Sequence, residues 1–173
     1  MIGFWFRPVW NIDISKNGGL RMFSIFKKIT NPENGFNFKQ DDPVMRIRVA
    51  TCAILMAVAG ADEFTDQERS RIIEILRNEF SLSREDAEGL MVVAGKEVDK
   101  SIDYWGFANT LNQSLSDIER IKIMENIWRV IYTDGQLSGH EDLMVHKFSL
   151  LLNLTHDQMI AAKLKIRTEK GLD

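Results

Sequence analysis

Carboxylates at two related turns are the side chains of this sequence best suited to bind a ligand. Asp62 ends one apolar segment, and Glu68 follows six residues later. Asp134 ends a second apolar segment, and Glu141 follows seven residues later. Hard divalent cations take several oxygen ligands, which carboxylates at turns can supply. If the two turns lie close together, the sequence predicts a candidate site for one divalent cation, whose identity it leaves open.

The same glutamates also have a structural explanation. Thr65 stands three residues before Glu68, and Ser138 stands three residues before Glu141. This is the spacing of a capping box, in which the glutamate satisfies a backbone donor at the start of a helix. The two aspartates can be solvated turn residues. Ion binding and helix capping therefore both remain open at this point.

The sequence lacks the other familiar signatures of a metal or catalytic site. An EF-hand starting at Asp62 would need a glutamate at its twelfth position, where Ile73 stands. Four residues after His140 comes Met144, not the second histidine of a His-Glu-x-x-His zinc motif. The single cysteine, Cys52, lies in an apolar segment, which is typical of a buried thiol. Because there is also no phosphate-binding glycine motif and no nucleophile–base pair, we expect no enzymatic activity.

The composition is that of an ordinary soluble globular protein, with 45% hydrophobic and 27% charged residues. The charge is unevenly distributed. Residues 1–40 carry six Lys or Arg against two Asp or Glu, a net charge of +4. Residues 41–173 carry sixteen against twenty-three, a net charge of −7. An acidic domain is poorly suited to bind nucleic acid through its phosphates, so we expect cations or basic proteins as partners.

Helix signals recur along the whole chain from residue 42 onward. Asp42 followed by Pro43 predicts a helix that ends near Gly60. Five later helix starts are predicted by a Ser or Thr with an Asp, Glu or Gln three residues on. These pairs are Thr65/Glu68, Ser83/Asp86, Ser116/Glu119, Ser138/Glu141 and Thr155/Gln158. With a short helix over residues 104–112, the pattern predicts an all-α domain of seven helices at residues 43–170.

A degenerate repeat relates the two halves of this domain. Residues 58–62 match residues 130–134 at an offset of 72, and in both places an apolar helix ends at an aspartate before the next capping box. Two equivalent helical hairpins can pack about a pseudo-twofold axis. We therefore expect this packing to bring the two acidic turns together.

The N-terminal 42 residues are expected to form an arm outside the domain. Phe23, Phe26 and Ile29 share one face of a short amphipathic helix with two lysines beside it, and residues 30–42 form a polar linker. Such a helix can attach weakly to an anionic membrane surface. Gly18-Gly19 can be encoded by a ribosome-binding sequence, so we expect Met22 to be the initiator, with a genuine arm over residues 1–21 as the alternative.

The location of the protein follows from what the sequence lacks. No apolar segment reaches the roughly eighteen residues that a membrane span needs, and no signal peptide is recognisable. We expect a cytoplasmic protein, with a peripheral position at the inner face of the membrane if the amphipathic segment binds there.

Several of these motifs, in this order and spacing, resemble the TerB family of tellurite resistance proteins. The similar segments are residues 58–62 with 65–68, residues 132–137 with Glu141, the helix over 117–131 and the closing residues 150–154. The resemblance covers about residues 44–168. It departs from the family at Glu63, where glycine is frequent, while the second turn keeps Gly135.

The resemblance implies an all-helical domain with pseudo-twofold halves, related to the N-terminal domain of the DjlA membrane co-chaperones. It also implies action in membrane-associated stress-response complexes and a metal site in the two turns. The positions that match this site are Asp62, Glu68, Asp134 and Glu141.

Two functional hypotheses result. The first is a non-enzymatic helical module of tellurite resistance or stress response that binds a divalent cation and protein partners. The second is an interaction scaffold, similar to an accessory domain of a co-chaperone, that binds no metal and uses the glutamates only as caps. Neither the partner nor the oligomeric state is determined by the sequence.

Overall fold

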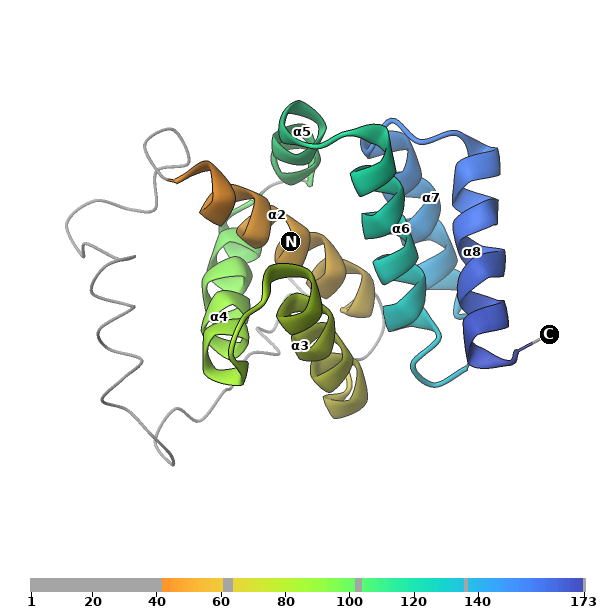
Figure 1. The fold of residues 1–173 in the computed structure, drawn as a ribbon, viewed down its shortest axis with the longest axis horizontal. Coiled ribbons are helices and arrows are strands. Elements are labelled where there is room, and N and C mark those ends of the chain that lie inside the picture. Colours follow the sequence, from red (N-terminus) through yellow and green to blue (C-terminus); the bar gives the residue numbers. More distant parts are fainter. Residues whose placement is uncertain (1–41, 61–63, 102–103, 136, 173) are drawn as a thin grey trace, which may run out of the picture. The chain divides into compact units, whose positions relative to one another are not determined.

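The computed structural model describes residues 42–60, 64–101, 104–135 and 137–172, and this part of the chain consists of seven α-helices and no strand (Figure 1). The helices are α2 (Pro43–Ala59), α3 (Asp66–Phe80), α4 (Arg84–Lys100), α5 (Trp105–Ser114), α6 (Asp117–Ile131), α7 (Gly139–Leu151) and α8 (His156–Lys170). The all-α prediction is confirmed. The expectations for the N-terminal helix, the linker and Met22 lie outside the described residues. Asp62 and Glu63 do as well.

The contacts divide the chain into two compact units, residues 1–37 and 38–173, and all described residues belong to the second. None of the helices in this described part is both long enough and apolar enough to cross a membrane.

The predicted capping signals start the helices. Four of the five boxes close in both directions, with the hydroxyl accepting from the backbone and the N3 side chain accepting in return. The exception is Ser83/Asp86, in which Ser83 accepts from the Asp86 backbone at 3.0 Å and its hydroxyl donates to the Asp86 carboxylate at 2.7 Å. Aspartate is one methylene shorter than glutamate, which explains why the reciprocal bond to the cap backbone is not made there.

Helix α2 forms the centre of the core. Every residue from Val49 to Ala59 is buried, and the helix packs against α3, α4, α5, α6 and α7. In Figure 1, α3 and α4 lie on one side of α2, and α6, α7 and α8 form a group on the other. A helix that is apolar around its circumference is stable in water only when other helices cover it on every side.

Helices α6 and α8 are joined by a series of polar contacts at a constant spacing. Lys165 pairs with Glu125 at 2.9 Å, and Arg129 pairs with Glu169 at 2.9 Å, each pair forty residues apart in sequence. The constant spacing shows that α6 and α8 run in the same direction, as Figure 1 also shows. The indole Nε1 of buried Trp128 donates to the carbonyl of Met159 at 3.2 Å, which fixes α8 against α6.

The two helical hairpins predicted from the repeat face each other. Helix α2 contacts α6 and α7, and α6 contacts α2 and α3. These contacts are reciprocal, as an approximate twofold relation between the α2–α3 and α6–α7 hairpins requires. The end of α6 and the starts of α3 and α7 are therefore positioned by the same packing that builds the core.

Truncation of Phe148, which is fully buried on α7, should strongly destabilise the fold. We expect Phe148→Ala to lower the free energy of unfolding by about 3–5 kcal/mol, because the cavity it leaves is lined by packed side chains. Leu150→Ala is the matched control, since Leu150 on the same helix is 76% exposed and its loss should change stability by less than about 0.5 kcal/mol. Urea unfolding followed by circular dichroism measures both. Equal losses in the two variants would contradict the assignment of the core face of α7.

Candidate functional site

Three of the four predicted ligands are among the described residues. One follows the C-terminal end of α6, and the other two lie at the starts of α3 and α7. Glu68 stands in the first turn of α3, Glu141 in the first turn of α7, and Asp134 in the turn between α6 and α7. Gly135 in this turn has a φ of 83°, a left-handed conformation that glycine adopts without steric cost. Asp62, the fourth predicted ligand, lies outside the described residues.

Both glutamates act as caps. The backbone N–H of Thr65 donates to Oε2 of Glu68 at 2.8 Å, and the Glu68 N–H donates to the Thr65 hydroxyl at 3.1 Å. The same two bonds join Ser138 and Glu141, at 2.8 and 3.1 Å. In each box the backbone donor uses Oε2. Capping therefore engages one carboxylate oxygen, and the second oxygen, Oε1, is the one suited to a ligand.

The environment of Glu141 differs from that of an ordinary capping glutamate. Its pKa is raised, first because the side chain is buried, with only 9% of the residue exposed, and then because the negative charges of Glu68 and Asp134 lie nearby. The hydrogen bonds from Ser138 lower the pKa of Glu141, but burial and the neighbouring charges raise it by more. The structure thus brings the three described carboxylates of the predicted site within electrostatic reach of one another.

Glu119 shows what the capping box does without these neighbours. It closes the same box with Ser116 at the start of α6, where it is fully exposed. There the backbone and side-chain hydrogen bonds from Ser116 lower the pKa of the carboxyl. The box itself therefore favours the ionised form, and the raised pKa of Glu141 comes from burial among like charges.

Positive side chains border the carboxylates on the side of α8. The ammonium of Lys170 donates to the carbonyl of Tyr132, two residues before Asp134. Burial and the nearby Arg71 lower the pKa of Lys170, and the charge of Asp134 acts against them. The negative potential at the α6–α7 turn is thus partly offset by a lysine at the end of the last helix.

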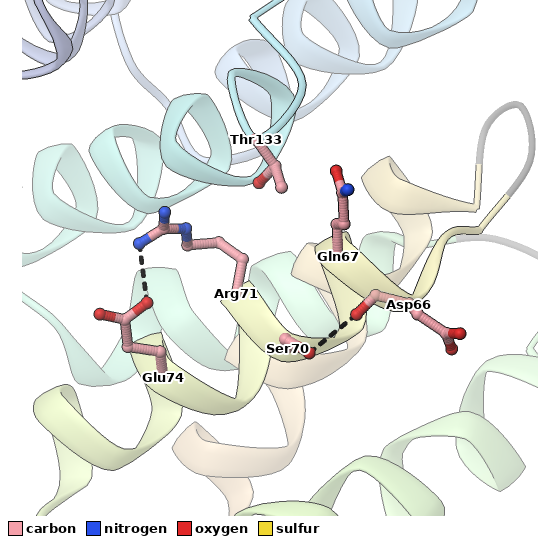
Figure 2. A pocket seen from close by; sticks show the side chains of 6 residues that line it. All are labelled: Asp66, Gln67, Ser70, Arg71, Glu74 and Thr133. Carbon is pink, nitrogen blue, oxygen red and sulfur yellow. Dashed lines mark hydrogen bonds and ion pairs between the residues drawn. The ribbon is translucent and has the colours of Figure 1, made fainter.

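A surface groove of about 440 Å³ lies beside these turns, between α3 and the end of α6 (Figure 2). Its lining residues are Asp66, Gln67, Ser70, Arg71, Glu74 and Thr133. Figure 2 shows Arg71 paired with Glu74, at 2.7 Å, and the Ser70 hydroxyl bonded to the Asp66 carbonyl, at 2.8 Å. The sequence does not predict this groove. Its only sequence signal is the polar face that residues 67, 70, 71 and 74 share on a helix.

The donor set of the turns suits a hard cation. The described candidates are all carboxylates, which magnesium and calcium prefer over nitrogen or sulfur ligands. Cys52 is buried in α2, where burial raises the pKa of its thiol, so it has no part in this site. Among the residues that the structure describes, which exclude Asp62, no three acidic, histidine or cysteine side chains are close enough to form a complete metal centre.

The fold and the acidic turns define an all-helical domain of two facing hairpins with carboxylates at the corners. The family model described as tellurite resistance protein TerB matches residues 48–164, which is more than half of the chain. The protein belongs to the TerB family. A comparison with curated proteins gave no significant match, and neither did one with solved structures.

Replacement of Glu141 by glutamine should stabilise the metal-free protein at neutral pH. Glutamine completes a capping box in this same chain, because the Thr155 N–H donates to Oε1 of Gln158 at 2.8 Å. Since folding raises the pKa of Glu141, the folded wild type loses stability as the pH rises from about 4.5, the ordinary value, through the folded-state value. We therefore expect Glu141→Gln to exceed wild type in free energy of unfolding at pH 7, with the difference closing below pH 4.5. Urea unfolding between pH 4 and 8, with a chelator present, measures it.

Glu119→Gln is the matched control for this experiment. Because its carboxyl has a lowered pKa in the folded state, loss of the charge should not stabilise the protein at pH 7. If Glu141→Gln were less stable than wild type in chelator at pH 7, the interpretation of Glu141 as a buried, repelled charge would be wrong.

Proposed function

We propose that this TerB protein is a non-enzymatic helical module that binds one divalent cation at its acidic turns and engages protein partners in tellurite resistance or envelope stress. The observation that carries the proposal is the burial of the capping carboxylate of Glu141 near the charges of Glu68 and Asp134, an environment that raises its pKa although an exposed capping box lowers the pKa of Glu119. The ligands we propose are Asp62, Glu68, Asp134 and Glu141. Their identity as ligands rests on the family resemblance and on the shared electrostatic environment of the last three.

The charge arrangement supports a cation more than a purely structural role. A capping glutamate needs only one oxygen, and at Glu119 at the start of α6 the capping hydrogen bonds lower the pKa with no contribution from another carboxylate. At Glu141 the fold instead accepts the cost of burying a carboxylate beside Glu68 and Asp134. A bound dication would supply the charge that offsets this repulsion.

The partner and the location are part of the same proposal. The domain carries the net negative charge of residues 41–173, so basic surfaces of other proteins suit it better than acidic ones. We place the protein in the cytoplasm, at the inner face of the membrane when it joins a membrane-associated complex. On this proposal, the cation and the protein partner both bind to the acidic domain of residues 41–173.

Calorimetric titration with Mg²⁺, Ca²⁺ and Mn²⁺ tests the cation site. We expect wild type to bind one ion, and Glu141→Gln to lose affinity by about tenfold or more, equivalent to about 1.4 kcal/mol. Glu68→Gln and Asp134→Asn should lose affinity as well, because each removes a charge from the same field. Glu119→Gln, which alters an identical box elsewhere, should bind as wild type does. Wild type that binds none of these ions, or binding unchanged in Glu141→Gln, would remove the cation from the proposal.

The metal-free scaffold remains a second candidate, and one observation favours it. Glu68 and Glu141 both complete capping boxes, so a structural role accounts for their positions without any ligand. On this hypothesis the double variant Glu68→Gln/Glu141→Gln should keep its fold and its partners, because glutamine preserves both caps. Affinity capture of partners by wild type and by the double variant, with and without chelator, separates the two. If the double variant loses its partners, and wild type loses them only when chelator is present, the result favours the cation-dependent module.

A further inference from the structure

Two of the three histidines of the chain lie next to each other across the corner between α7 and α8. His146 lies on α7, and His156 is the first residue of α8. Their ring centroids are 6.3 Å apart, and the rings are inclined by 32°. Both side chains are exposed. The sequence does not predict this pair, because ten residues and a change of helix separate the two histidines.

The corner that sets this distance is firmly held. The N–H of Leu154 donates to the carbonyl of Ser149 at 2.9 Å, and Leu152 and Leu154 are buried. The carbonyls that end α7 accept hydrogen bonds from other helices, since Asn112 donates to Leu151 at 2.8 Å and Arg120 donates to Leu152 at 2.7 Å. The backbone positions from which the two imidazoles extend are therefore fixed by the packing of four helices, and a ligand has to order only the two side chains.

The hydrogen bonding of His146 selects the tautomer that a metal ion needs. Its Nδ1 lies 2.9 Å from the carbonyl oxygen of Asp142. Because a carbonyl oxygen can only accept, Nδ1 carries the hydrogen in this contact, and in the neutral ring the lone pair is on Nε2. The Asp142 carboxylate lies 3.7 Å from the same nitrogen. Metal-binding histidines are commonly oriented in this way, by a carbonyl or carboxylate that accepts from the other ring nitrogen.

The separation of the rings suits a shared ion. With metal–nitrogen bonds of about 2.0–2.1 Å, the centroids of two imidazoles on one ion lie roughly 4.5–6.4 Å apart, depending on the bond angle. The observed 6.3 Å lies near the upper limit of this range, which corresponds to a wide nitrogen–metal–nitrogen angle. Because both side chains are exposed, small rotations shorten the distance, and water can occupy the remaining coordination positions.

We propose that His146 and His156 form a two-histidine site for borderline transition-metal ions, Zn²⁺, Ni²⁺ or Cu²⁺, that links α7 to the start of α8. Imidazole nitrogen is a good ligand for these ions, whereas magnesium and calcium prefer oxygen. The site differs from the carboxylate turns in chemistry and in position. His146 follows Glu141 by five residues, which turns it about 140° around a helix of 3.6 residues per turn. It does not depend on the function proposed above.

Titration of the full, untagged chain with Ni²⁺ at pH 7.5 tests the site. We expect one ion to bind to wild type, and His146→Ala and His156→Ala each to lower the affinity by about tenfold or more. His140→Ala is the matched control, because His140 is exposed on the same helix as His146 and is the one remaining histidine of the sequence. This variant should bind Ni²⁺ as wild type does.

A second measurement identifies the ligands directly. Paramagnetic Ni²⁺ should broaden the ring-proton resonances of His146 and His156 at lower ion concentrations than those of His140. Equal broadening of all three histidines, or equal affinity of His146→Ala and wild type, would overturn the two-histidine site. Loss of Ni²⁺ binding in Glu141→Gln alone would also overturn it and would assign the ion to the carboxylates, so the two sites can fail separately.

Discussion

The burial of α2 is the constraint on which the rest of the structure depends. A helix that is apolar on all sides must be covered on all sides, and five other helices do this here. Their placement around α2 brings the α2–α3 and α6–α7 hairpins face to face. The same packing that covers the central helix holds the described carboxylates at the hairpin corners near Glu141, although like charges repel.

The acidic corner shows how a structural motif can take on a second role through its surroundings. Glu119 and Glu141 make the same capping hydrogen bonds, yet the pKa of one is lowered and that of the other is raised. The difference lies in the burial of Glu141 and in two nearby carboxylates, Glu68 from the opposite hairpin and Asp134 from its own turn. A buried carboxylate near other negative charges reduces stability unless an ion or a cationic partner compensates it. Lys170, at the end of α8, supplies part of this compensation from within the chain.

Much of the fold could be predicted from local signals. The Ser and Thr caps with their partners three residues on predicted the starts of five helices, and Asp42 with Pro43 predicted a sixth, because a helix start has to satisfy its own backbone donors. The box at Ser83 was predicted as reciprocal and closes in one direction only, since the aspartate is too short. The groove along α3 and the pair formed by His146 and His156 were not predicted. Both are made by residues from separate segments of the chain, and only tertiary packing sets the distance between these segments.

The residue types at the two corners, and their equivalence through the internal repeat, were determined by the sequence alone. The sequence likewise determined the helical class, because capping and apolar periodicity are properties of short segments. Only the tertiary structure decided that Glu141 is buried, that Glu68 and Asp134 lie within reach of its charge, and that two imidazoles face each other across a corner. These properties depend on distances between helices, and such distances follow from how side chains fill the space around α2.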